Sequence, residues 1–183
     1  MTVFWIIVAI VVLVIAVLWW KGRPDELLRA AQAGDPDAQY QLAVDCYDGL
    51  NNRVQDRKAA AEWCMLAAQQ RHRDAQAMLG KMYDLGAGGL ERSREQAVHW
   101  YKKAAEKGHG ECQCLLGRAY FHGKGIPQNY MQAYCWLNVA RAQGDAGKAE
   151  TEMMNEIEGK LEPQQLLHAQ KLSVQMHEKM KGG

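Results

Sequence analysis

Residues 116–136 read LGRAYFHGKGIPQNYMQAYCW, and the same pattern of small, apolar and tryptophan residues occurs twice earlier in the chain. Its tryptophans are Trp63, Trp100 and Trp136, spaced by 37 and 36 residues. Leucines, glycines and alanines recur in nearly the same steps: Leu42, Leu79 and Leu116; Gly49, Gly86 and Gly123; Ala60, Ala97 and Ala133; Ala67, Ala104 and Ala140. A period of this length indicates a stack of supersecondary units, because one unit alone cannot bury its apolar face.

Each unit is predicted to contain two helices. The first begins near residues 35–36, 73–74 and 110–111, where Asp35 can accept hydrogen bonds from free amides and Pro36 suits the first helical position. It ends at a glycine-rich turn, since Gly86 and Gly123 can adopt a positive φ at little cost. The second helices cover about 56–70, 93–107 and 130–143. Their apolar residues recur at helical steps of three and four, as in Ala97, Trp100, Tyr101, Ala104 and Ala105.

Two glycines lie inside the predicted first helices. Gly80 and Gly117 each destabilise a helix interior by about 1 kcal/mol relative to alanine. Such a residue is tolerated where a neighbouring helix must come close. We expect the indoles of Trp100 and Trp136 to fill the space opposite these glycines.

The predicted fold is therefore an all-α solenoid of helix–turn–helix repeats at 35–70, 71–107 and 108–143, preceded by one transmembrane helix. Residues 21–34 are expected to form a linker and an N-terminal capping helix, and 144–183 to form C-terminal capping helices. Terminal caps of this kind keep an open-ended stack soluble. β-Branched residues are scarce after residue 20, which argues against a sheet protein.

Residues 1–20 carry no charged side chain. The apolar run from Val3 to Trp20 would span about 27 Å as a helix, close to the ~30 Å of a bilayer core. A cleaved secretory signal is the alternative, but no Lys or Arg precedes the run and no small-residue cleavage site ends it. We therefore predict a transmembrane anchor at 1–20.

The side of the membrane follows from two further observations. Lys21, Arg23 and Arg29 follow the apolar run, and positive flanks tend to stay on the cytoplasmic side. Five cysteines, an odd number, fit a reducing compartment better than a disulfide framework. The predicted localisation is the inner (plasma) membrane, single-pass, with the repeats in the cytoplasm rather than the periplasm.

Composition restricts the possible chemistry. Lys plus Arg total 22 and Asp plus Glu total 21, so the net charge of +1 gives no sign of a nucleic-acid partner. Cys112 and Cys114 could suggest a metal site with His109 or His122, but side chains two residues apart on a helix point about 200° apart. We expect no metal, no cofactor and no enzymatic activity. A cysteine nucleophile stays an alternative, because catalytic triads are adjacent in space rather than in sequence.

The repeated motifs resemble those of a known repeat family. The segment Leu116-Gly117-x-x-Tyr120-x-x-Gly123-x-Gly125, followed by Ala133-x-x-Trp136, resembles a Sel1-like repeat, a helix–turn–helix unit related to tetratricopeptide repeats. Leu79-Gly80-x-x-Tyr83-x-x-Gly86-x-Gly88 with Ala97-x-x-Trp100 is a second match, and Pro163-Gln164-Gln165 with Ala169 is similar to a closing helix of such arrays. The first unit departs from the pattern at Ala43, Cys46, Asn51 and Arg71. The resemblance implies a scaffold or adaptor role in protein–protein interaction, often in bacterial envelope or signalling processes.

One face of the first helices is the predicted binding surface. Its residues follow spacings of three, four and three: Asp37, Tyr40, Val44 and Tyr47; Asp74, Ala77, Lys81 and Asp84; Glu111, Cys114, Arg118 and Phe121. If the first helices line the inner curve of a superhelix, this face is a concave groove. Its aromatic and charged side chains suit a peptide or a partner helix, and Lys81 and Arg118 favour an acidic one. A merely solvated face is the alternative.

These observations together predict a membrane-tethered, non-enzymatic scaffold or adaptor that binds a membrane-associated protein in this groove. Tethering would raise the effective concentration for such a partner. A small structural or assembly subunit of a membrane complex is one alternative. A Sel1-repeat hydrolase is the other.

Overall fold

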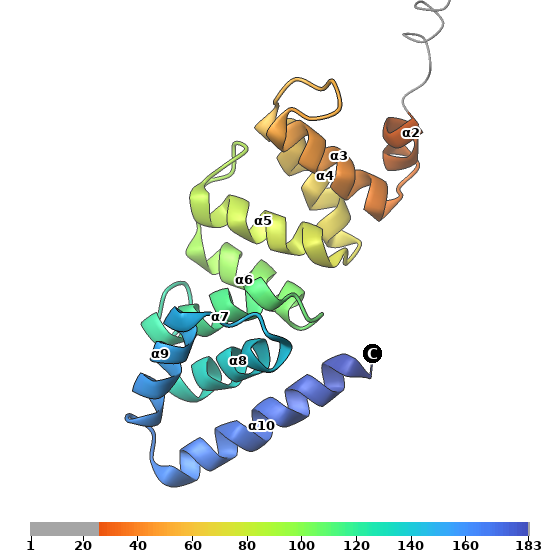
Figure 1. Ribbon diagram of the computed structural model, residues 1–183. Helices are drawn as coiled ribbons and strands as arrows, with labels where there is room; N and C mark the ends of the chain where they lie inside the picture. Colours follow the sequence, from red (N-terminus) through yellow and green to blue (C-terminus); the bar gives the residue numbers. More distant parts are fainter. Residues whose placement is uncertain (1–25, 183) are drawn as a thin grey trace, which may run out of the picture.

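The computed structural model describes residues 26–182, and every regular element among them is an α-helix (Figure 1). The helices are α2 (Glu26–Gln32), α3 (Pro36–Asp48), α4 (Arg57–Gln69), α5 (Arg73–Leu85), α6 (Arg94–Ala105), α7 (Gly110–His122), α8 (Tyr130–Gln143), α9 (Lys148–Glu158) and α10 (Pro163–Lys181). The predicted all-α helical repeat fold is confirmed. The predicted anchor at 1–20 lies outside the described residues, and no helix between residues 26 and 182 is long and apolar enough to cross a membrane.

The helices stack as three antiparallel pairs. α3 packs on α4, α5 on α6 and α7 on α8, while α4 and α6 each also contact the first helix of the next pair. α2 covers α3 at one end, and α10 covers α8 at the other. The turns within the pairs (49–56, 86–93 and 123–129) lie along one edge of the stack, and the turns between pairs (70–72, 106–109 and 144–147) lie along the opposite edge (Figure 1).

Local hydrogen bonds explain where the first helices begin and end. The Asp35 carboxylate accepts from the backbone N–H groups of Asp37 and Ala38 at 2.9 and 3.2 Å. The corresponding caps of α5 and α7 are histidines, which the sequence analysis missed: the Nδ1 atoms of His72 and His109 accept backbone N–H groups at 3.1 and 3.3 Å. Accepting at Nδ1 requires a neutral tautomer, and burial lowers the pKa of His109 even beside the Asp74 carboxylate.

The first helices end as the glycine pattern predicts. Gly49, Gly86 and Gly123 follow α3, α5 and α7 with φ values of 72°, 68° and 66°. The first unit departs from the family pattern at Asn51, yet this residue also has a positive φ, of 52°. Asparagine tolerates this conformation better than most residues, so the turn keeps its geometry without the second glycine.

Each indole is wedged between its own pair and the preceding element. Trp100 lies in a core cluster with residues of α4 and α5, and Trp136 in one with residues of α6 and α7. Trp63 packs with α2 and α3 in the same way, although it is only half-buried. The three tryptophans are thus equivalent in place as well as in sequence, and they join neighbouring units.

The residues opposite the helix glycines differ from our expectation. A Cβ atom on Gly80 would lie 2.6 Å from the ring of Tyr101, and one on Gly117 would lie 2.7 Å from the Leu137 side chain. The predicted Trp100 and Trp136 are therefore not the residues that require these glycines. In the first unit the matching positions are Ala43 and Cys64, both buried in one core cluster. A small thiol replaces the large side chain there, so alanine fits where the other units need glycine.

Buried glutamines connect each unit to the one before it. The side-chain amides of Gln39, Gln76 and Gln113 donate to the backbone carbonyls of Ala31, Ala68 and Ala105, at 3.0, 3.1 and 3.2 Å. All three glutamines are buried, and they are spaced by 37 and 37 residues. Hydrogen bonding makes their burial tolerable, so this ladder fixes the register between successive pairs.

We predict that Gly80→Ala lowers the free energy of unfolding by about 1–3 kcal/mol, because the new Cβ overlaps the Tyr101 ring. Combining it with Tyr101→Cys recreates the pair found at Ala43 and Cys64. The double variant should therefore be more stable than the sum of the single effects, by at least about 1 kcal/mol. Urea unfolding of the full chain in detergent, followed by far-UV circular dichroism, measures both quantities; simple additivity would contradict the size-matching explanation.

A second stability prediction concerns Arg71. It follows α4 with φ of 70°, whereas Gly34, Gly108 and Gly144 occupy the corresponding positions with φ of 97°, 79° and 86°. A non-glycine residue is strained in this region by about 1–2 kcal/mol. Arg71→Gly should therefore raise the melting temperature, and Gly108→Arg should lower it; a decrease for Arg71→Gly would mean that the side chain contributes more than the strain removes.

Candidate functional site

The predicted binding face lies along α3, α5 and α7, but its members differ in exposure. Asp37, Glu111 and Arg118 are exposed, while Tyr40, Val44, Tyr47, Asp74, Lys81 and Asp84 are half-buried. Both tyrosines of this face already contact other side chains of the fold. The Tyr40 ring stacks on His72 with centroids 4.7 Å apart, and the Arg57 guanidinium lies 5.3 Å from the Tyr47 ring centroid.

Three residues of this face, Ala77, Cys114 and Phe121, are buried instead of exposed, and Phe121 is the largest of them. It is 8% exposed and belongs to a core cluster with Met154 and Ile157 of α9. Its ring also meets Tyr130 edge-on, with centroids 5.7 Å apart. The C-terminal helices therefore cover Phe121, which fills the interior instead of facing a ligand.

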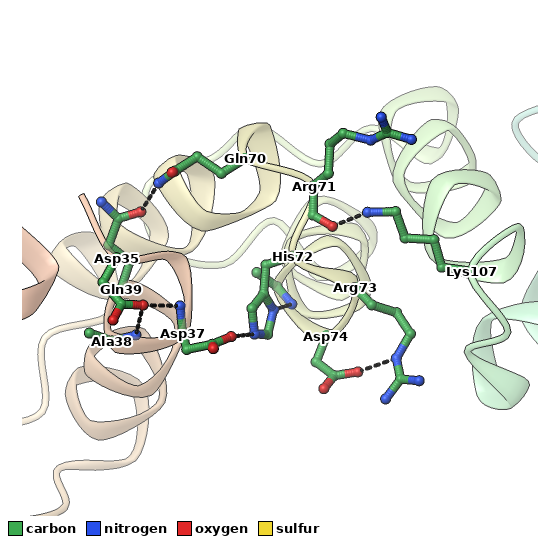
Figure 2. A network of polar contacts seen from close by, with 11 residues as sticks. Asp35, Asp37, Ala38, Gln39, Gln70, Arg71, His72, Arg73, Asp74 and Lys107 are labelled. Atoms are coloured by element: carbon green, nitrogen blue, oxygen red, sulfur yellow. Dashed lines mark hydrogen bonds and ion pairs between the residues drawn. The ribbon is translucent and has the colours of Figure 1, made fainter. Parts of the chain in front are cut away.

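Several charges of the predicted face pair with each other across units. Lys81 Nζ lies 2.7 Å from Glu111 Oε2, so its charge is balanced within the fold. His72, which lies beside this face and is neutral as a helix cap, has its Nε2 atom 3.1 Å from Asp37 Oδ1, so this contact is a polar one and not an ion pair; both residues are visible in the network of Figure 2. Exposed ion pairs such as Lys81–Glu111 contribute about 0–1 kcal/mol each. They connect neighbouring pairs of helices, and Lys81 is a weak basis for attracting an acidic ligand.

A cleft between the second and third units holds unbalanced positive charge. We call it the cationic cleft; its cavity of about 250 Å³ is lined by Asp84, Arg92, Arg94, Ala97, Val98, Tyr101, Leu115, Arg118, Ala119, His122 and Lys124. Four permanent cations and one histidine thus line the cleft with a single carboxylate, and one of these cations, Arg118, also pairs with a carboxylate outside the lining, that of Glu150. The apolar side chains come mainly from α6 and α7. The cleft combines an apolar floor with a cationic rim, and it contains Asp84 and Arg118 of the predicted face.

Close packing of one turn on a helix start brings these cations together. A Cβ atom on Gly125 would lie 2.5 Å from the carbonyl oxygen of Arg94, so only glycine lets the 123–129 turn rest on the beginning of α6. This contact places Lys124 beside Arg94 in the cleft wall. Arg92 reaches the cleft from the preceding turn and donates from Nε to the Asp84 carbonyl at 2.8 Å. Arg92, Arg94 and Lys124 were not predicted as site residues, because their convergence depends on this packing.

Arg118 connects the cleft to the C-terminal helices. Its Nη1 lies 3.7 Å from Glu150 Oε1. The other carboxylate oxygen of Glu150 accepts the backbone N–H of Gly147 at 3.1 Å, at the start of α9. Glu150 therefore serves the helix start as well as the ion pair, and the Arg118 guanidinium stays half-exposed at the rim.

The cysteines are core residues. All five are buried free thiols, and burial raises the pKa of Cys64 and Cys112 to about 12. A thiol with so high a pKa is almost entirely protonated at neutral pH and is a poor nucleophile or metal ligand. Over residues 26–182 no group of three His, Cys, Asp or Glu side chains is arranged to hold a metal ion.

Comparison with known proteins identifies the family. The model of the Sel1 repeat matches residues 36–72, 73–109 and 110–145. The chain belongs to the Sel1 repeat family. Each matched Sel1 repeat starts at the first residue of α3, α5 or α7, so one repeat corresponds to one helix pair and the turn that follows it. Sel1 repeat proteins generally act in protein–protein interaction.

Two solved structures are similar to this Sel1 repeat chain. A Sel1 repeat protein from Oxalobacter formigenes shares 30% sequence identity with a TM-score of 0.64, over 72% of this chain and 96% of the other. A protective antigen of uropathogenic Escherichia coli, which displays an SLR fold, shares 29% identity with a TM-score of 0.61. The similarity covers 84% of this chain but only 40% of the Escherichia coli protein. No curated protein matches the chain.

Proposed function

We propose that this protein is a membrane-tethered adaptor whose repeats bind an acidic segment of a partner protein in the cationic cleft. The observation that carries the proposal is the composition of that cleft, in which Arg92, Arg94 and Lys124 lie with one carboxylate, Asp84, while a fourth cation, Arg118, pairs with Glu150 at the rim. Opposite charge on a partner would speed its association and fix its orientation. The nearly neutral chain as a whole makes this local excess more distinctive.

The floor of the cleft adds a second element of specificity. Val98, Leu115 and the ring of Tyr101 line it, and buried apolar anchors contribute much of the energy of an interface. The segment that fits best carries an apolar side chain flanked by aspartate or glutamate. A cavity of about 250 Å³ has room for one such side chain.

The tether is part of the same proposal. The apolar, uncharged segment 1–20 supports a single-pass anchor in the inner membrane. Basic residues after it, together with five unpaired thiols, support a cytoplasmic position for the repeats. Fixing the repeats at the bilayer raises their effective concentration toward a membrane-associated partner.

We predict that charge reversal in the cleft abolishes partner binding. Arg94→Glu with Lys124→Glu should reduce the recovery of a specific protein, co-purified with the full chain from detergent-solubilised membranes, by at least about tenfold. Lys102→Glu is the matched control, since this exposed α6 lysine does not line the cleft. Recovery should also fall at high salt, because screening weakens exposed charge pairs.

Equal recovery by the cleft variant and by Lys102→Glu would remove the cleft assignment. Recovery of several proteins in fixed stoichiometry, unaffected by salt, would instead support a small assembly subunit of a membrane complex.

The side of the membrane can be tested with an added thiol. Val54 is 86% exposed in the α3–α4 turn, whereas the native thiols are buried. A membrane-impermeant maleimide should label Val54→Cys only after cell lysis if the repeats are cytoplasmic. The native chain, labelled only after denaturation, is the control; labelling of Val54→Cys in intact cells would place the repeats on the other side.

A further inference from the structure

A second cleft lies at the opposite edge of the stack, where the α4–α5 turn meets the end of α6. We call it the Arg71 cleft; its cavity of about 400 Å³ is lined by Ala68, Gln69, Arg71, Gln76, Lys103, Glu106 and Lys107. Three cations thus face one carboxylate. The cationic cleft lies at the other end of α6, roughly 17 Å away at 1.5 Å per residue, so the two sites are separate.

The cations of the Arg71 cleft are held close together. Lys107 directs its ammonium group at the backbone carbonyl of Arg71 (Figure 2). Burial, with the nearby positive charges of Arg71 and Lys103, lowers the pKa of Lys107. Lys103 is held in turn by the Trp100 ring, with its ammonium 4.5 Å from the ring centroid. Crowding like charges is unfavourable unless an anion balances them.

Arg71 itself is an unexpected residue at its position. The three corresponding positions are glycines, and Arg71 adopts their left-handed backbone with φ of 70°. An arginine therefore lines this cleft at a backbone position where glycine would be unstrained. Strain of this kind concentrates at functional sites.

The wall of the cleft also contains an unused acceptor. Gln76 is 2% exposed and donates from Nε2 to the Ala68 carbonyl, but its Oε1, like that of Gln113 one unit later, has no hydrogen-bond partner among the described residues. In the first unit, Gln39 Oε1 accepts from Gln70 Nε2 at 2.7 Å. Lys107 occupies the position of Gln70 one period later and bonds to Arg71 instead. A buried acceptor without a partner is unfavourable, and a ligand N–H would satisfy it.

A cavity of mixed polar and apolar lining adjoins the Arg71 cleft. Glu106 lines both, and the second cavity, of about 430 Å³, is otherwise lined by Trp136, Met176, Lys179 and Met180. The C-terminal end of α10 forms its other wall and comes back toward the α6–α7 turn (Figure 1). Methionines adapt to ligands of different shape. The two cavities together place a cationic end beside an end where Trp136 and two methionines lie with the charged residues Glu106 and Lys179.

We propose that these adjoining cavities bind the carboxyl terminus of a partner polypeptide. The terminal carboxylate lies among Arg71, Lys103 and Lys107, and the last backbone N–H donates to Gln76 Oε1. A preceding apolar side chain contacts Trp136 and the α10 methionines. A phosphate or a fatty acid matches the charge but brings no N–H group, so the polypeptide terminus satisfies more of the site.

The test uses a fluorescein-labelled peptide ending in two leucines, prepared with a free carboxylate and as the carboxamide. Fluorescence anisotropy with the full chain in detergent should show the carboxylate form binding at least about tenfold more tightly, since amidation removes the charge that the cations recognise. Equal affinity for both forms would overturn the proposal. So would competition by inorganic phosphate or laurate as strong as that of the unlabelled peptide.

Two variants separate binding from folding. Lys103→Gln should weaken binding of the carboxylate peptide by about tenfold, whereas Lys102→Gln, its neighbour outside the cleft, should not. Arg71→Gly should weaken binding while raising the melting temperature, a combination that damage to the fold cannot produce. Arg94→Glu with Lys124→Glu, in the cationic cleft, should leave this affinity unchanged, so failure here is distinguishable from failure of the proposed adaptor function. Unchanged binding by Arg71→Gly and Lys103→Gln would overturn the assignment.

Discussion

The structure depends on how closely the two helices of a pair can approach. In the second and third units a helix glycine lies against a large side chain, Tyr101 or Leu137, and has no room for a Cβ atom. In the first unit both partners are intermediate in size, Ala43 and Cys64, and they fill the same place in the core. The constraint is thus on the combined volume of a pair of positions, and the sequence satisfies it in two ways. A deviation from the family pattern at one position is matched at the other.

Stacking pairs of this kind produces two edges with different chemistry. The turns within pairs lie on one edge, and those between pairs on the other (Figure 1). On the first edge, a glycine turn resting on the start of α6 gathers the cations of the cationic cleft. On the second, the end of α6 and the turn at Arg71 gather another set. The same helix therefore contributes to two clefts.

Local and periodic features could be predicted from the sequence, and long-range packing could not. Helix pairs, glycine turns and equivalent tryptophans follow from periodicity and backbone preference. The caps at His72 and His109 could have been predicted, since these residues lie one and two repeat periods after Asp35. Histidine, however, is not a common N-cap residue. Phe121 fell on the expected face, yet its burial depends on α9, which lies outside the repeat pattern. Lys124 enters a cleft only because its turn packs on another unit.

The glutamine ladder makes the repeats interchangeable modules. Each rung joins a side chain in the first helix of a pair to a carbonyl in the helix before it, with the same eight-residue separation every time. Duplication or loss of one whole period would leave the remaining rungs intact, so such an array can change length during evolution without redesign of its junctions. Recombination with a breakpoint inside a helix pair would instead separate Ala43 from Cys64 or Gly80 from Tyr101. Recombination is therefore tolerated only at the boundaries between pairs.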